Sequence, residues 1–352
     1  MSVLLSATTP FLLVLALFLV SLLIVFSAAA WFTRRLEALC DRLDFSAGML
    51  SILSALGANI PNYVASIVAI ANGQQDVGLG IIIGSNIYNL AIILGLSSLA
   101  APGSHGIHLR LKEKHDVLII TYYAFAITLT TLVAIWLLPR TPIVFPVSAQ
   151  LLTLVPLILV LILTCAIFSS FVYHIVKRPH PSHTRSLDKQ EESSSRTYPT
   201  SLKRLIAEVL FALVVALAGV IVMVQSGEQL TADAHMPAVL AGLLVLAVAT
   251  SLPNTVVAVI LVRTGRMAAC VEEIFSSNSI NAALGIALPL LLWRTLLQDQ
   301  LLLALDGPFI ILLTLGIIVC IRINRLNRIT GLLLLLSYAM WVGIHLLLNV
   351  RV

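Results

Sequence analysis

The chain has 352 residues, of which 59% are hydrophobic and 11% are charged, and its mean hydropathy is +1.05. These values exclude a soluble globular domain and predict a protein that lies in a lipid bilayer. The formal net charge of +5 does not indicate nucleic acid as a partner, because the basic residues fall in loops between apolar runs.

Apolar runs of roughly 20 residues, the length that crosses about 30 Å of hydrocarbon as a helix, recur along the chain. Ten such runs predict an all-α membrane protein with ten transmembrane helices. No basic residue precedes the first run, as a signal peptide would require, so we expect it to be a true transmembrane helix. The predicted spans are 11–31, 48–71, 77–99, 116–138, 145–175, 205–225, 237–262, 268–292, 308–321 and 329–349.

Lys and Arg residues alternate between the two sides of this ten-span arrangement. Of the 21, only Arg140, Arg294 and Arg351 fall in loops or ends on one side. The positive-inside rule therefore predicts a multi-pass protein of a plasma or inner membrane with both termini outside.

A long polar segment, residues 177–204, separates five predicted spans from five. It holds prolines, serines and mixed charge, as a linker does, and its basic residues place it in the cytoplasm. The predicted units are a first five-helix repeat at 1–176, the linker loop at 177–204 and a second repeat at 205–352.

An internal repeat links the two halves at an offset of 192 residues without a gap, so that residues 55–96 superpose on 247–288. Because each half contains an odd number of spans, the second half must enter the membrane from the opposite side, and such inverted repeats predict a site at mid-membrane. The identical pairs include Pro61 with Pro253, Asn62 with Asn254, Ser85 with Ser277, Asn86 with Asn278, and Asn89 with Asn281.

The repeated prolines, Pro61 and Pro253, fall inside predicted spans. Each lacks an N–H and clashes with the carbonyl four residues earlier. Helices interrupted at membrane depth line cavities or bind ions, although a harmless kink is the alternative.

Uncharged polar side chains accompany these prolines at helical spacing. Those three or four residues apart share one face of a helix. We predict that they form an ion or substrate site, with simple helix packing as the alternative. The eight candidates are Asn59, Asn62, Ser85, Asn89, Ser251, Asn254, Ser277 and Asn281.

The repeated stretches resemble the α-repeats of the sodium/calcium exchanger superfamily, whose hallmark is G-T-S-x-P-E followed by G-S-N-I-x-N or G-S-N-I-x-D. Residues 84–89 read GSNIYN and match fully, while 57–62 (GANIPN) and 249–254 (ATSLPN) match the other element. The resemblance implies two inverted five-helix halves that exchange sodium for calcium or another cation by alternating access.

This chain departs from that pattern at its charged positions. In the family the residue after each motif proline is acidic and binds ions, but here Asn62 and Asn254 stand there, and Asn281 replaces an acid common in relatives. Calcium sites normally contain Asp or Glu, whereas amides suit Na⁺, K⁺ or a neutral solute.

We therefore predict a secondary active antiporter with a charge-neutral central site, selective for a monovalent cation or weak for Ca²⁺. Its partners are the bilayer and small transported cations, with no cofactor. A transport-inactive scaffold or regulator and a transporter of a neutral solute stay open. The sequence holds no HExxH, GxSxG or P-loop motif, so an enzyme is not indicated.

Two acids, Glu272 and Glu273, fall within the eighth predicted span. Glu273 shares a helix face with Ser277 and Asn281 but is about 12 Å along the axis from Asn281. We expect one of these acids to serve as a pathway or gating group, the alternative being a residue that extends to the membrane surface. Glu208 is expected to pair with Arg204 at i, i+4.

Overall fold

The computed structural model describes residues 10–43, 47–103, 106–138, 147–177, 201–233, 240–293 and 299–349. Within these ranges the regular structure is helical apart from an isolated bridge between Ile107 and Leu326. The predicted all-α class is confirmed. Most of the predicted linker, residues 178–200, lies outside the described part.

The helices fall into two sets of similar order, each with a broken second helix and a third helix that contains a π-helical segment. The first set is α1 (Phe11–Arg42), α2 (Ala47–Ala58), α3 (Ile60–Ala71), α4 (Gln75–Tyr88), η1 (Asn89–Ile93), α5 (Leu94–Ala100), α6 (Leu111–Trp136) and α7 (Val147–Val176). The second set is α9 (Leu202–Asp233), η2 (Ala241–Leu246), α11 (Ala247–Arg263), α12 (Met267–Ile280), η3 (Asn281–Ala287), α13 (Leu288–Leu292), η4 (Leu302–Asp306), α14 (Gly307–Arg322) and α15 (Arg328–Asn349).

Eight of the described helices are long and apolar enough to cross a membrane. A ninth candidate is the pair Ala241–Leu252 and Asn254–Arg263, which is bent by 50°. The predicted span 48–71 consists of α2 and α3, which have 12 residues each. The count of ten transmembrane helices therefore stays a prediction.

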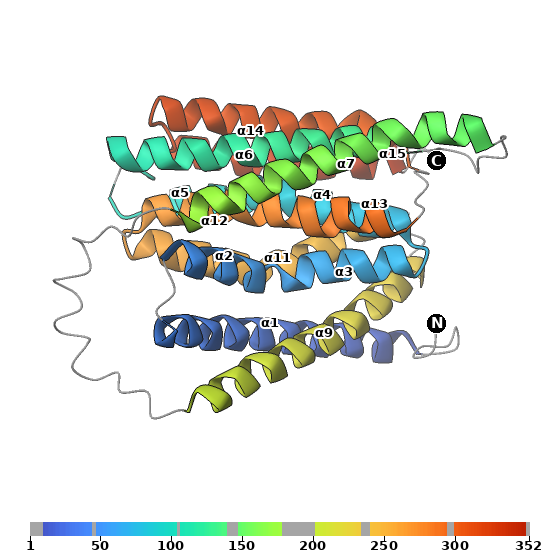
Figure 1. Cartoon of the computed structure of the whole chain (residues 1–352), viewed down its shortest axis with the longest axis horizontal. Helices are drawn as coiled ribbons and strands as arrows, with labels where there is room; N and C mark the ends of the chain where they lie inside the picture. Colours follow the sequence, from blue (N-terminus) through green and yellow to red (C-terminus); the bar gives the residue numbers. More distant parts are fainter. Residues whose placement is uncertain are drawn as a thin grey trace.

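The third helices of the two sets occupy the middle of the molecule and run in opposite directions (Figure 1). The segment α4–α5 runs from right to left in this view, and α12–α13 runs from left to right. Helices α1 and α9 cover one side of this middle layer, while α6, α7, α14 and α15 cover the other. The second helix of each set packs against the third helix of the other: η2 packs against α4, and α3 packs against η3.

Glycine allows the close contact between α4 and η2. A Cβ at Gly84 would meet the carbonyl oxygen of Leu243 and would lie 2.8 Å from the Cβ of Ala247. A Cβ at Gly242 would meet the carbonyl oxygen of Val77. Small residues at such crossings let helix backbones approach each other, as is common in membrane proteins.

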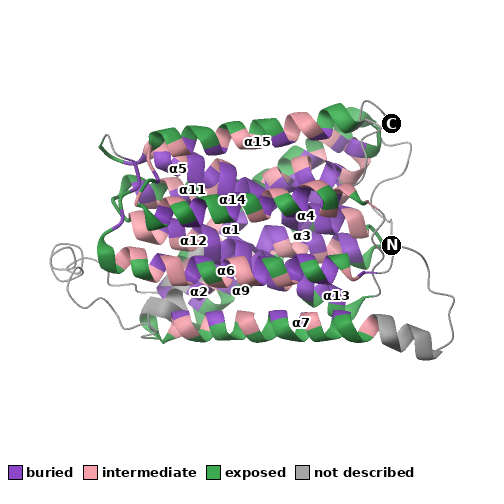
Figure 2. Cartoon of the chain, turned by 90° about the horizontal axis from the view of Figure 1, so that it is seen from above, coloured by how far each residue is buried: buried purple, intermediate pink, exposed green. Residues whose placement is uncertain are grey.

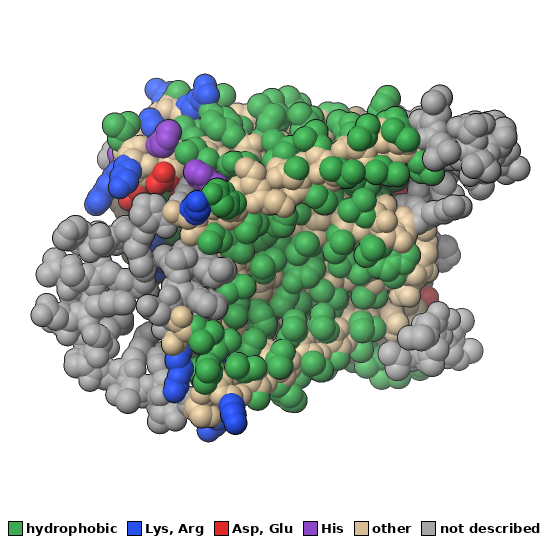
Figure 3. Space-filling model, in the orientation of Figure 1, with side chains coloured by type: hydrophobic (Ala, Val, Ile, Leu, Met, Phe, Trp, Pro, Cys, Tyr) green, Lys and Arg blue, Asp and Glu red, His purple; other side chains and the backbone are tan. Residues whose placement is uncertain are grey.

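The outer surface is apolar around the flanks and basic at one end (Figures 2 and 3). Buried residues gather in the middle, and the outward faces of α7 and α15 are exposed. Those faces carry Leu159, Ile162, Leu333 and Leu336, among others, which suits contact with lipid. The described Lys and Arg residues stand where α1, α7, α11 and α14 end and where α6, α9, α12 and α15 begin, at the left of Figure 1.

A buried carboxylate joins α15 to the start of α14. The Oδ1 atom of Asp306 accepts a hydrogen bond of 2.7 Å from Nε1 of Trp341 and lies 2.7 Å from Nε2 of His345. All three side chains are fully buried. This cluster lies in the second half and was not predicted from the sequence.

Candidate functional site

The first helix break lies at Asn59, between α2 and α3. The break lies two residues before Pro61, and α3 begins after it, with the main-chain oxygen of Asn59 accepting the first bonds of that helix from the N–H groups of Asn62 and Tyr63. Pro61 occupies the first turn of α3, where its missing N–H costs nothing. The Asn59 side chain at this break lies in the protein interior, where it is fully buried.

The second break is a bend at Pro253 within α11. The helix axis changes direction by 50° between Leu252 and Asn254, and the π-helical segment η2 precedes α11. The two prolines therefore act differently: one follows an interruption, and the other bends a continuous helix.

Asn59 is the centre of a first hydrogen-bond network that joins both halves. Its Nδ2 donates to the Ala55 carbonyl (2.7 Å) and to Oγ of Ser277 (2.8 Å). Its Oδ1 accepts from Nδ2 of Asn254 (2.9 Å) and of Asn62 (3.3 Å). Four of the predicted site residues thus meet at one point.

A second network links α4 and α12 through four asparagines in a reciprocal pattern. Nδ2 of Asn86 donates to the main-chain oxygen of Asn278 (3.3 Å), and Nδ2 of Asn278 donates to that of Asn86 (3.2 Å). Asn89 donates to Oδ1 of Asn278 (2.8 Å), and Asn281 donates to Oδ1 of Asn86 (3.1 Å). Every bond has a counterpart 192 residues away, as a two-fold relation produces.

Both networks leave oxygen atoms without a hydrogen-bond partner. The outer asparagines of each network donate their Nδ2 groups to the amide oxygens of Asn59, Asn86 and Asn278, so their own Oδ1 atoms receive no bond. Buried polar atoms are nearly always paired in proteins, so this group indicates a place for a ligand. The unpartnered buried oxygens are Oδ1 of Asn62, Asn89, Asn254 and Asn281, and Oγ of Ser251.

All eight side chains predicted for the site are buried, none exposing more than 1% of its surface. Ser277 joins the Asn59 network, whereas Ser85 makes only a long bond of 3.4 Å to the Ala247 carbonyl. Asn86 and Asn278, which hold the second network together, were recognised only as identical residues of the repeat. The signal that the sequence offered was an Asn at both of these equivalent positions.

Glu273, one of the two predicted pathway acids, is hydrogen-bonded to a residue of the site. Its Oε1 accepts a hydrogen bond of 2.9 Å from Oγ of Ser277, whereas its Oε2 is buried without a partner. Glu272 lies beside it in α12 and is half-buried. Among the described residues no group of three or more His, Cys, Asp or Glu side chains is placed to hold a metal ion.

The π-helical segments begin directly at the site. Segment η1 starts at Asn89 and η3 starts at Asn281, the two equivalent asparagines of the second network. Such segments often occur at functional sites, because the extra residue per turn changes the direction of nearby side chains.

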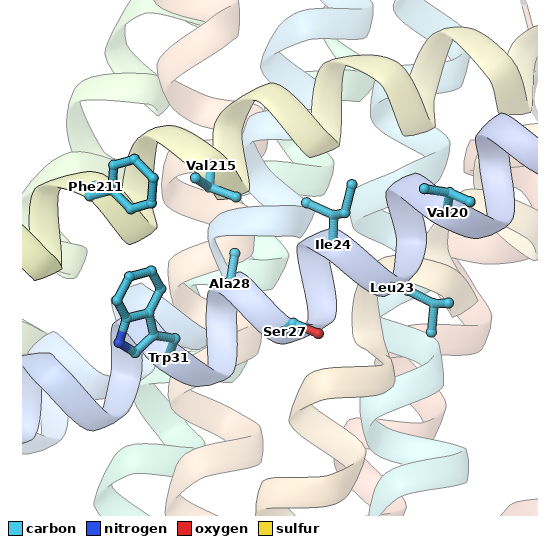
Figure 4. Close-up of a pocket in the computed structure, with 8 residues that line it drawn as sticks. All are labelled: Val20, Leu23, Ile24, Ser27, Ala28, Trp31, Phe211 and Val215. Atoms are coloured by element: carbon cyan, nitrogen blue, oxygen red, sulfur yellow. The ribbon is translucent and has the colours of Figure 1, made fainter.

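An open hollow on the molecule's flank is a separate feature (Figure 4). It lies between α1 and α9, and apart from Ser27 its lining is apolar, including Ile24, Trp31 and Phe211. Its chemistry does not suit an ion, so the candidate site is the buried amide cluster.

The sequence matches a family model described as sodium/calcium exchanger protein over residues 13–174 and 204–347. It is 31% identical over 84 residues to the inner membrane protein YrbG of Escherichia coli (strain K12), which is 24% of this chain and 25% of that protein. It is 33% identical over 72 residues to sodium/potassium/calcium exchanger 4 of Homo sapiens, or 20% of this chain and 12% of that protein. The curated relatives are thus matched over a quarter of their length or less.

The fold is similar to that of the sodium-calcium exchanger NCX_Mj soaked with Na⁺ and Sr²⁺. The TM-score is 0.61 at 16% identity, over 95% of this chain and 99% of that chain. The similarity extends over both sets of helices.

Proposed function

Because the chain belongs to the sodium/calcium exchanger protein family, we propose that it is a cation antiporter whose central site holds a monovalent cation with neutral oxygens. In this proposal amide oxygens, rather than carboxylates, replace water around the ion. They belong to Asn62, Asn89, Asn254 and Asn281. Sodium and potassium are the expected cargo, with calcium bound weakly.

One observation carries this proposal: the buried, unpartnered oxygens of Asn62, Asn89, Asn254 and Asn281. Leaving a buried polar atom unpaired costs about 1–3 kcal/mol. A bound cation offsets this cost, because each amide oxygen coordinates the ion as a water oxygen would. A solute that needs hydrogen-bond donors is less well served, since the Nδ2 groups of all four residues are occupied within the protein.

Calcium is disfavoured by charge. The amides and hydroxyls that would coordinate a divalent ion do not neutralise it, and uncompensated charge at membrane depth costs several kcal/mol. The residues that would compensate it in relatives are Asn62 and Asn254 in this chain.

The proposed cycle is alternating access by two inverted five-helix halves, with both termini outside and the segment 177–204 in the cytoplasm. The opposite directions of α4–α5 and α12–α13 support it. So does the gathering of Lys and Arg at one end of the molecule.

The test is a flux assay with the purified full chain in liposomes. Gradients of Na⁺, K⁺, Li⁺, H⁺ and Ca²⁺ are imposed in turn, and counter-ion movement is followed with ion-selective dyes. We expect coupled exchange of monovalent cations and Ca²⁺ flux at least tenfold slower. Absence of flux for all five ions would refute the proposal.

A transport-inactive scaffold is the competing function, motivated by the lost acids. The variant with both Asn62→Glu and Asn254→Glu separates the two views. Monovalent flux in the unmodified chain excludes the scaffold. Calcium flux that appears only in the double variant shows that the scaffold retains a working gating mechanism without native cargo.

A further inference from the structure

The carboxylate of Glu273 is connected to the centre of the amide cluster by two hydrogen bonds. Ser277 Oγ donates to Glu273 Oε1 over 2.9 Å, and Asn59 Nδ2 donates to Ser277 Oγ over 2.8 Å. Asn59 comes from the break between α2 and α3, and Glu273 comes from α12. The connection therefore crosses from one half of the chain to the other.

The carboxylate also fixes the direction of this chain of bonds. Because an ionised carboxylate only accepts, the Ser277 hydroxyl must point its hydrogen at Glu273 and accept from Asn59. Asn59 in turn accepts from Asn62 and Asn254. The oxygens of Asn62 and Asn254 are left to face the ion.

The two halves of the chain have different residues at the position of Glu273. Its equivalent at the 192-residue offset is Ile81, which is fully buried. In the hydrogen bonds that build the two networks, the carboxylate that takes part is that of Glu273. When ionised, it gives the site one negative charge, where an acid at both equivalent positions would give two.

We propose that Glu273 is the counter-charge residue of the ion site, and that its single charge restricts the cargo to one monovalent cation at a time. This inference rests on the proposed cation antiport. Glu273 acts without touching the ion, through its field and through the orientation of Ser277 and Asn59, so it is a positioning residue.

Coulomb's law gives the expected size of the effect. At about 12 Å, the separation of Glu273 from Asn281 along the helix axis, and at an effective dielectric constant of about 20, a unit charge strengthens the binding of a monovalent cation roughly tenfold. A divalent ion gains more from the same charge, but its second charge stays uncompensated.

The test compares three variants of the full chain in liposomes. Glu273→Gln removes the charge but keeps an oxygen that accepts from Ser277; Glu273→Asp keeps the charge on a shorter side chain; Glu272→Gln removes the neighbouring charge. We expect Glu273→Gln to raise the KM for the transported monovalent cation about tenfold, with the other two variants within about threefold of the unmodified chain.

Two results overturn the inference. One is a Glu273→Gln variant with unchanged KM and unchanged preference for monovalent over divalent ions. The other is an equal loss in Glu273→Gln and Glu273→Asp with a lower melting temperature in both, which marks a structural role. If the unmodified chain moves no cation, the proposed function itself fails, and that outcome is seen before any variant is made.

Discussion

At the scale of single residues, Asn86 and Asn278 each hold a main-chain carbonyl of the opposite half. Replacing Asn278 with Leu removes its bond to the Asn86 carbonyl and leaves Nδ2 of Asn89 without an acceptor. Each orphaned buried group costs about 1–3 kcal/mol. We therefore expect Asn278→Leu to lower the melting temperature in detergent by several degrees.

Asn86→Leu is the equivalent variant in the other half, since it removes the matching bonds. The reciprocal pattern predicts that it lowers the melting temperature by a similar amount. A large loss in one variant with none in the other would contradict the reciprocal network.

Asp306 gives a second prediction at this scale. Its buried carboxylate accepts a hydrogen bond from Trp341 and lies 2.7 Å from Nε2 of His345, and leaving a buried polar group without its partner costs about 1–3 kcal/mol. Asp306→Asn changes the group that faces both partners, so it should destabilise the chain more than Trp341→Phe, which removes one donor. Thermal unfolding measures both, and an Asp306→Asn variant as stable as the unmodified chain would show that the carboxylate is not needed.

The composition of the site was predictable to a large extent, because polar residues are scarce in apolar spans and these recur at one offset. The direction of the hydrogen bonds in the two networks was not predictable. That Asn59 is the centre depends on how the break between α2 and α3 meets α11 and α12. That Asn86 and Asn278 bond main-chain carbonyls depends on how closely α4 and α12 approach. Spacing along the chain contains neither.

At the scale of elements, helix positions follow from the apolar runs, and most predicted boundaries lie within a few residues of those observed. One exception is the predicted span 308–321. The observed helix begins earlier, at Leu302, because the π-helical segment η4 precedes α14. Such segments leave no periodic signature in an apolar sequence, so η1 and η3 were not predicted either.

The crossing of α4 over η2 gives an element-scale prediction. Gly84→Ala places a Cβ against the Leu243 carbonyl, which is main chain and does not move aside easily. We expect a lower melting temperature and slower ion flux. Gly316→Ala in α14 is the matched control, because its Cβ meets nothing within 4 Å and alanine favours helix. Similar behaviour of the two variants would show that the crossing tolerates a side chain.

At the scale of the whole molecule, the side on which Lys and Arg gather predicts orientation. In a chain without its native cysteines, Lys112→Cys and Lys203→Cys should react with an impermeant thiol reagent in opened membranes but not in intact cells. Asp299→Cys lies at the opposite end and should react in intact cells. The reverse pattern would invert the assigned topology. The basic residues of the other side, Arg140, Arg294 and Arg351, lie outside the described part of the chain.

The reciprocal bonds between Asn86 and Asn278 give one chain the kind of contact that identical subunits make across a two-fold axis. In such a dimer every residue of the contact occurs twice, so an acid on one side has an equal on the other. This chain escapes that constraint, because Glu273 in one copy of the repeat stands where the other copy has Ile81. Joining both copies in one sequence therefore permits an asymmetry of charge that two identical subunits cannot have.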